Sequence, residues 1–540
     1  MGRALQVLGL SGLFMMGVAS TTAFAQDPDR ADDDNANNTI ADPHHNTSQP
    51  KESEHPAPVI EPSAETKTPP VGAVAPAPAV SLPTAKPNRG DLSITGYFRG
   101  GFGAVVQETY PATGGMPGDT NFMPGGAVGG RMACFSLANP AGLVAKYRLG
   151  NECEVWSETH FTMVTYAGDD GVVSTVHFMP TIFIPTTDVG YSPNGTTSAV
   201  QIRTTATGAT VSFPNLYVDI KGISWLGGGT AWAGTRYYKR EFVYINDFFY
   251  WNPSGVGAGV EDIKLGQDLR LSYGAFAVDG EPQPPNMPTD PLLPLQVDFG
   301  VRNDLQLRGI KPWESGEFQL GGEYIVDYSY HPVSMDDYGR PIGSVTHGGW
   351  GVTGQFVQKV LGGDNKLALQ FGKGGGTGFG TLSRFYYPDF SLYFAPSEYR
   401  FRFVDVLTIQ PVDWLGAQFD VIYQRDQNFL GVQGQNTNWY SAGGRVTWAF
   451  TEHAKLAGEI GYDRVTKSIN TDVQELTKFT IAPTLTTGRG FMTRPELRLF
   501  YTYAVWSAAA RAANVDSATL YRSTSLLSGS NVGVQIETWY

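Results

Sequence analysis

The stretch Ser530–Tyr540, which reads SNVGVQIETWY, carries the pattern that decides the fold of this chain. Side chains of an extended strand point alternately to its two faces, so residues two apart share a face. One face is mostly apolar and consists of Val532, Val534, Ile536, Thr538 and Tyr540. The other face consists of Gly533, Gln535, Glu537 and Trp539. A strand that is apolar on one face and carries a carboxylate on the other suits a wall between lipid and water, which predicts a transmembrane β-barrel.

The opposite end of the chain has the three parts of a secretory signal peptide. Arg3 gives a basic start, an apolar run covers about 5–19, and Ala23-Phe24-Ala25 forms a small-x-small cleavage site. A membrane-spanning helix is the alternative, but the apolar run is too short for it. The pattern therefore predicts a signal peptide over residues 1–25 and an exported protein.

The composition excludes two classes of protein. No stretch of eighteen apolar residues follows the signal peptide, and the mean hydropathy is -0.19, which excludes a helical membrane protein. The formal net charge of -13 argues against nucleic acid as a partner. With 65 Gly, 30 Phe, 26 Tyr and only 16% charged residues, the chain fits many short strands separated by turns.

Residues 26–90 form a separate region. The region begins acidic, turns rich in Pro and Ala, and lacks the aliphatic residues that a folded core needs. We expect a disordered periplasmic linker, with a tether to the cell wall or to a partner protein as the alternative. The adjacent His44 and His45 could bind a metal, although two exposed histidines in a flexible segment usually have no such role.

The chain has two cysteines, Cys134 and Cys153. In an oxidising periplasm, a pair nineteen positions apart is expected to form a disulfide, which stabilises by roughly 3 kcal/mol in the chain-entropy model. Two free thiols or half of a metal site are the alternatives, but no His or Cys lies at a ligand-like spacing. We expect the disulfide, no metal site and no cofactor.

Alternation recurs from 91 to 540. Leu92, Ile94 and Phe98 share one parity while Tyr97 and Arg99 share the other. Glu154, Trp156, Glu158 and His160 likewise fall on one face. About 450 residues at roughly 25 per strand predict sixteen to eighteen antiparallel strands around a water-filled lumen. We therefore expect an all-β transmembrane barrel of about 18 strands; a soluble array of β-sandwiches is the alternative.

Several motifs carry a family resemblance, and they occur in family order across the region 91–540. They are GYFR (96–99), KYRLGNECE (146–154), TAWAGTRYY (230–238), DFFYW (247–251), GVGAG (255–259), EIGYD (459–463), TRP (493–495) and the C-terminal strand. The chain resembles the maltoporin and sucrose-porin family. The resemblance implies a homotrimer of eighteen-stranded barrels in the lipid of a Gram-negative outer membrane. It also implies a function in passing sugars and oligosaccharides, without catalysis.

The resemblance also implies which residues line the channel. The aromatic slide on which sugar rings stack maps onto Tyr97, Trp156 and Trp539. The polar track and constriction map onto Arg99, Arg148, Glu158, Arg240, Phe242, Asp247 and Phe249. Phe242 stands where maltodextrin channels have an aspartate, and Phe249 replaces a tyrosine. Asp364 and Met492 replace two slide aromatics, and Tyr191 is a possible stand-in for the residue that a neighbouring subunit contributes.

Three other functions are alternatives to a sugar channel. A non-selective diffusion porin is the nearest alternative, and saturable block of the channel by sugars would distinguish the two. A barrel enzyme would need a Ser, His and carboxylate set, and none of the eight histidines lies in such a motif. A purely structural tether would make residues 26–90 the active part.

Overall fold

The structure is a computed structural model of the chain. It describes residues 87–106, 133–138, 144–185, 201–203, 210–279, 299–327, 332–335, 341–344, 348–380, 397–429, 433–468, 472–513 and 526–540. The expected signal peptide, the linker up to residue 86, His44, His45 and Tyr191 lie outside these ranges. Among the described residues, no helix has the length and the apolar character of a membrane span.

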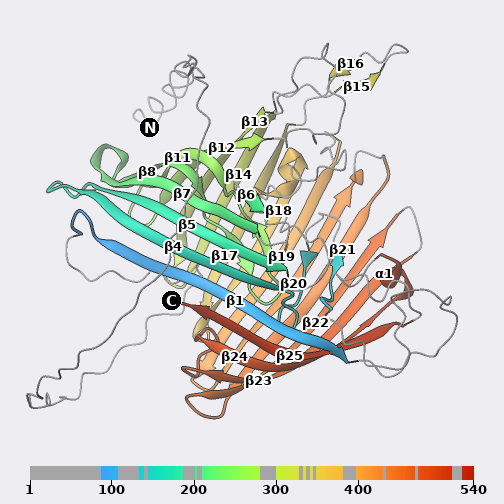
Figure 1. Ribbon diagram of the computed structural model, residues 1–540. Helices are drawn as coiled ribbons and strands as arrows, with labels where there is room; N and C mark the ends of the chain where they lie inside the picture. Colours follow the sequence, from blue (N-terminus) through green and yellow to red (C-terminus); the bar gives the residue numbers. More distant parts are fainter. Residues whose placement is uncertain are drawn as a thin grey trace, which may run out of the picture. The chain divides into compact units, whose positions relative to one another are not determined.

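Eighteen antiparallel strands close a barrel (Figure 1). They are β1 (Leu92–Val106), β4 (Glu154–Ala167), β5 (Val173–Pro185), β7 (Thr210–Ile223), β8 (Gly229–Arg236), β11 (Gly255–Lys264), β12 (Arg270–Asp279), β13 (Phe299–Trp313), β14 (Gly316–Asp327), β17 (Gly349–Val360), β18 (Gly363–Gly374), β19 (Tyr399–Val412), β20 (Leu415–Gln427), β21 (Thr437–Ala449), β22 (Ala454–Lys467), β23 (Gln474–Thr486), β24 (Glu496–Trp506) and β25 (Ser528–Trp539). The short β6 (Gln201–Arg203) adds a further piece beside β7. The expected fold class is confirmed.

The barrel closes where the first strand meets the last. Tyr97 of β1 pairs with Trp539 of β25, and the register runs on to Val106 opposite Ser530. Figure 1 shows the blue β1 lying along the red β25. On its other side β1 pairs with β4, so strands from both ends of the described chain share one wall.

The expected alternation of β25 is present. Gln535 and Glu537 are 1% and 0% exposed and face inward, whereas Val532 and Ile536 are 40% and 37% exposed on the outer surface. The same alternation continues along the whole of β24, where every second residue is buried. The wall is therefore polar inside and apolar outside, as a barrel in lipid requires.

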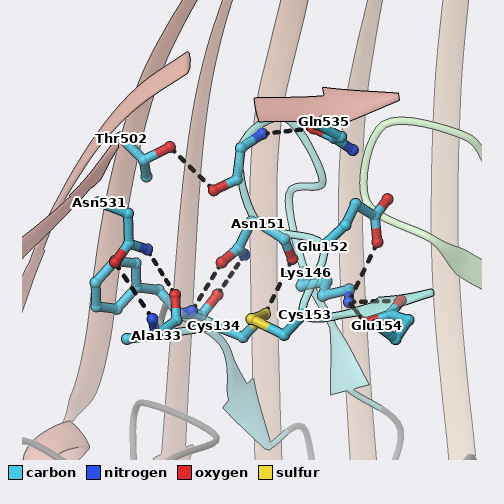
Figure 2. Close-up of a disulfide and its surroundings, with 12 residues drawn as sticks. Ala133, Cys134, Lys146, Asn151, Glu152, Cys153, Glu154, Thr502, Asn531 and Gln535 are labelled. Carbon is cyan, nitrogen blue, oxygen red and sulfur yellow. Dashed lines mark hydrogen bonds and ion pairs between the residues drawn. A yellow bond between two sulfur atoms is a disulfide. The ribbon is translucent and has the colours of Figure 1, made fainter. Parts of the chain in front are cut away.

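Residues Lys146–Cys153, called the inner loop below, fold into the barrel (Figure 2). The disulfide Cys134–Cys153 joins the loop to 133–138, with Cα atoms 5.9 Å apart, and confirms the expected pair. Gly150 fastens the loop to the wall, because its N–H donates to Gln535 (3.1 Å) and its carbonyl accepts from Thr502 (3.1 Å).

Two wall glycines make room for the ring of Tyr147. A Cβ atom at Gly461 would lie 1.9 Å from Cδ2 of that ring, and one at Gly443 would lie 2.2 Å from Cε1. The Tyr147 hydroxyl donates to Asp420 (3.2 Å) and bonds to Ser441 (3.0 Å) on neighbouring strands. Only residues without a side chain at 443 and 461 allow the inner loop to dock this closely.

A second segment, Glu241–Trp251, also folds inward and is called the inner hairpin below. It pairs β9 (Glu241–Val243) with β10 (Phe248–Trp251). Its apolar residues Val243, Tyr244, Ile245, Phe248, Tyr250 and Trp251 form one buried cluster with wall residues that include Val404, Ile422 and Trp439. The backbone N–H groups of Lys146 and Arg148 donate to the carbonyls of Asn246 and Ile245, both at 2.9 Å. The inner loop and the inner hairpin therefore fill part of the lumen together.

Candidate functional site: the narrowed lumen

The inner hairpin has one face against the wall and one face towards the remaining lumen. Phe242, Asp247 and Phe249 keep part of their surface exposed, whereas their neighbours in the hairpin are buried. Asp247 has a φ of 57°, the left-handed conformation, at the turn between β9 and β10. The hairpin thus presents two aromatic rings and a carboxylate on its lumen face.

These two rings begin a continuous stack. Phe242 and Phe249 stack with centroids 4.9 Å apart and planes 20° apart. The guanidinium of Arg240 lies 5.0 Å from the centroid of Phe249 and 3.4 Å from that of Tyr237. The stack holds Arg240 by cation–π contacts.

Arg99 joins the hairpin to the wall. Its guanidinium donates to Asp247 (3.0 Å) on the hairpin and to Glu154 (2.8 Å) on β4. It also lies 5.8 Å from the centroid of the Trp156 ring. Burial raises the pKa of Asp247, but the guanidinium groups of Arg99 and Arg148 outweigh this effect and lower the pKa below its ordinary value. Asp247 is therefore a carboxylate at neutral pH.

Glu158 links two aromatic residues of the lumen. The indole N–H of Trp156 donates to Glu158 Oε1 (3.0 Å), and the hydroxyl of Tyr237 donates to the same oxygen (3.4 Å). All three residues are half-buried. A carboxylate between two ring-bearing side chains offers hydrogen-bond acceptors beside apolar surfaces.

Tyr97 and Trp539 lie on the same inner wall, where β1 meets β25. The Tyr97 hydroxyl donates to Glu537 (2.8 Å) and accepts from Arg148 (2.6 Å). The guanidinium of Arg494 lies 4.6 Å from the centroid of Trp539. The three expected slide aromatics, Tyr97, Trp156 and Trp539, therefore all face inward on adjacent strands.

Arg148 is placed differently from the other residues expected in the polar track. It is 4% exposed and donates to Glu152 (2.5 Å) and Glu537 (3.0 Å). Burial raises the pKa of Glu152, but Arg148, Arg99 and Lys146 outweigh it and hold the pKa well below its ordinary value. The guanidinium of Arg148 is thus committed to internal partners.

The two departures from the slide have identifiable surroundings. Asp364 on β18 is buried and pairs with Lys359 at 3.2 Å, so it offers no ring and no free charge. Met492 is partly buried and packs against the apolar cluster of the inner hairpin. Neither position provides a stacking surface.

Two features of the site were missed from the sequence. Tyr237 lies just beyond the end of β8, where alternation no longer tells which way a side chain points. Glu537 accepts hydrogen bonds from Tyr97, Arg148, Tyr244, Arg494 and Arg498. Its inward parity was predicted, but its partners lie up to 440 positions away, and no local pattern reveals them.

Several solved structures match this chain at low sequence identity. OccAB1 of Acinetobacter baumannii is 11% identical, with 85% of this chain and 98% of that chain covered and a TM-score of 0.41. OprB of Pseudomonas putida is 9% identical, with 83% and 94% covered and a TM-score of 0.34. OmpT of Vibrio cholerae in its trimer form is 7% identical, with 84% and 100% covered and a TM-score of 0.32. Matches this distant carry no argument about function.

The sequence match to a family model is of a different kind. The model described as LamB porin matches residues 92–540, from the first residue of β1 to the last residue of the sequence given. A match of this extent shows that the chain belongs to the LamB porin family.

Proposed function

We propose that this porin is an outer-membrane channel through which sugars and oligosaccharides diffuse along aromatic rings and charged side chains of the lumen. The observation that carries the proposal is the pairing of ring faces with charged groups on the inner surface. Trp156 lies between Arg99 and Glu158, and Arg240 lies between Tyr237 and Phe249.

This pairing suits the surface of a sugar. A pyranose has apolar C–H faces that can stack on aromatic rings, and hydroxyls around its edge that exchange hydrogen bonds with charged groups. Hydrogen bonds to charged groups are stronger than those to neutral groups. Passage also requires that each contact breaks easily, which half-exposed side chains in a water-filled lumen allow. No covalent step is needed.

The constriction supports a preference different from that of a maltodextrin channel. Phe242 and Phe249 place an apolar pair where that type of channel has an aspartate and a tyrosine, and Asp364 and Met492 lack stacking rings. We therefore propose weaker binding of long oligosaccharides than in such a specialist.

The outer surface supports a trimer in lipid. Most of the outer surface of β20–β24 is apolar or aromatic, with Val421, Trp448, Phe479 and Leu499 among its exposed side chains. Near the closure of the barrel, in contrast, Thr159 and Tyr540 bond through their hydroxyls (3.1 Å), and Tyr540 covers Gly96. Small and hydroxyl-bearing residues suit contact with another subunit better than contact with lipid.

The proposal for residues 1–90 rests on the sequence alone. We propose a cleaved signal peptide over 1–25 and a periplasmic linker over 26–90. Sugar passage measured after deletion of 26–90 should equal that of the full chain. A loss of passage would instead make the linker part of the channel.

A non-selective diffusion porin is the second candidate, and one observation favours it. Arg99 donates hydrogen bonds to Glu154 and Asp247, and Arg148 donates to Glu152 and Glu537. Fewer of their N–H groups therefore remain free to bind a sugar. A channel of this kind would pass small solutes without saturation.

Substitution of Trp156 distinguishes the two candidates. Loss of one stacking contact worth about 0.5–1.5 kcal/mol should weaken sugar block of single-channel current by roughly two- to tenfold in Trp156→Ala. Trp225→Ala is the matched control, because Trp225 is 81% exposed and lies in a turn of the barrel, in η1 (Ser224–Leu226). Equal block constants in the two variants would reject the slide and favour the non-selective porin.

A further inference from the structure

We propose that His160 and His177 form a binding site for a first-row transition-metal dication on the inner wall of the barrel. The two histidines lie on neighbouring strands, β4 and β5, which Figure 1 shows side by side with β7. His160 Nε2 and His177 Nδ1 are 3.2 Å apart. Two nitrogens that bind one tetrahedral zinc ion at ~2.05 Å lie about 3.3 Å apart, so this spacing is that of two ligands of one ion.

A carboxylate orients the second histidine for this role. Asp219 on β7 lies 3.2 Å from His177 Nε2 and therefore fixes the proton on that nitrogen. His177 Nδ1 is then left with its lone pair towards His160. A carboxylate that holds the far nitrogen of a metal-binding histidine is the arrangement that sets its tautomer and raises its basicity in metal sites.

The pair is reachable from the lumen. His160 is half-buried and shares the inner face of β4 with Trp156 and Glu158, which line the passage. His177 is buried behind it, with its ring stacked on Tyr217 at 4.2 Å and an interplanar angle of 3°. Rotation of the His160 ring about its side-chain bonds would aim its lone pair at an ion held by His177 Nδ1, with water in the remaining positions.

The charges around the pair permit a cation. Lys221 lies 3.3 Å from Asp219 but points largely into solvent, since its side chain is 52% exposed. Arg236 stacks on Tyr217 (4.6 Å) and is neutralised by Glu261 (2.9 Å). In the described residues neither cation is hydrogen-bonded to the two histidine nitrogens, and Glu261 offsets the repulsion that Arg236 exerts on a positive charge at His160.

The ligand chemistry selects the kind of metal. Imidazole nitrogens suit Cu²⁺, Ni²⁺ and Zn²⁺, with Cu²⁺ bound most tightly, whereas Ca²⁺ and Mg²⁺ prefer sets of oxygen ligands. In the described residues no cluster of three or more His, Cys, Asp or Glu side chains could hold a metal, so this is a two-histidine site completed by solvent. An ion bound there would lie beside the sugar path and obstruct it.

The first test measures binding directly. Electron paramagnetic resonance of Cu²⁺ added to the purified protein carrying His44→Asn/His45→Asn, which removes the adjacent histidines of the linker, should show two nitrogen ligands. The signal should be lost when the double variant His160→Gln/His177→Asn is made in the same background. Asp219→Asn should weaken Cu²⁺ affinity by about 10–100-fold, because it removes only the orienting carboxylate. His453→Asn is the control, since His453 lies in the turn between β21 and β22.

The second test measures the consequence for the channel. Micromolar Cu²⁺ should reduce single-channel current reversibly, with the current restored by a chelator, and Ca²⁺ should have no effect. The double variant His160→Gln/His177→Asn should conduct normally without metal and resist Cu²⁺. An affinity for Cu²⁺ in that double variant equal to that of the unaltered protein would overturn the proposal. Because the spectroscopic test requires no conduction, a failure of the sugar-channel proposal would leave the metal site testable.

Discussion

The inner loop and the inner hairpin both narrow the lumen, but different forces hold them. The inner loop docks through directional contacts, with Gly150 bonded to Gln535 and Thr502, Arg148 bonded to Glu537, and a disulfide at its end. The inner hairpin docks mainly through a buried apolar cluster, to which Glu241 adds ion pairs with Arg308 (3.1 Å) and Lys366 (2.8 Å) on the wall. Hydrogen bonds and ion pairs specify one position, whereas an apolar face tolerates changes that preserve its volume.

This difference separates structure from selectivity. The charged groups of the inner loop form the hydrogen bonds and ion pairs that hold the loop in place, so they contribute little accessible surface to the passage. The hairpin uses one face for packing and leaves Phe242, Asp247 and Phe249 on the other. We therefore expect substitutions around the inner loop to alter stability, and substitutions on the lumen face of the hairpin to alter selectivity.

Glu537→Gln should have the largest effect on the free energy of unfolding. Glu537 is fully buried and compensates Arg148, Arg494 and Arg498. Arg148 would keep Glu152, and Arg494 and Arg498 would share Glu496, so one carboxylate fewer would balance the three buried guanidinium groups, at a cost of about 3–5 kcal/mol. Urea unfolding of the protein in lipid vesicles measures this. Glu452→Gln is the control, because its 61% exposed side chain pairs with Arg489 in solvent and should change stability by less than about 1 kcal/mol. Equal shifts would show that the network around Glu537 does not hold the inner loop.

Gly461→Ala should displace the inner loop and cost about 1–3 kcal/mol through overpacking. The added Cβ would lie 1.9 Å from the ring of Tyr147, so the loop must move and single-channel conductance should change. Gly458→Ala on the same strand meets no atom within 4 Å and is the matched control. Adding Tyr147→Ala to Gly461→Ala should remove the clash. If Gly461→Ala and Gly458→Ala change stability and conductance equally, the docking of Tyr147 does not require glycine at position 461.

Phe242→Asp tests the lumen face of the hairpin. It adds a second carboxylate to the lumen face that carries Asp247 and should raise the preference for cations over anions, which reversal potentials in a salt gradient measure. The loss of stability should be smaller than for a change on the buried face, because Phe242 is only partly buried where it packs against the apolar cluster. Val243→Asp places the same carboxylate on the buried face, where Val243 is 0% exposed, and should destabilise by several kcal/mol. Comparable stability of the two variants would contradict the division of the hairpin into two faces.

Acidification should have the smallest effect. The folded-state pKa of Asp247 lies below its ordinary 3.8, so the stability from its pair with Arg99 is present above that value and is lost only as the pH falls through the folded-state pKa. Between about pH 7 and about pH 4 the contribution of this pair should stay constant. Comparison of Asp247→Asn with the unaltered protein over that range isolates the contribution. A stability difference that shrinks well above pH 4 would show that the carboxylate protonates earlier.

The sequence was informative wherever the pattern was local. Alternation in β25 predicted the inward Glu537 and the outward Ile536, and parity predicted that Trp156 faces the lumen. It was uninformative where partners are distant, as for Tyr147 against Gly443 and Gly461. Burial of Arg148 depends on Glu537, which lies 389 positions away and which no spacing rule connects to it. Hydrogen bonds between remote strands are set by barrel closure, and a single chain read along its length does not contain that geometry.

Planar-bilayer conductance titrated with glucose, sucrose and maltohexaose tests the central claim most directly. The account predicts stable open channels whose current falls saturably as sugar is added, with a block constant for each sugar. Open channels whose current does not respond to any of the three sugars would contradict the claim that the rings and charges of the lumen bind carbohydrates.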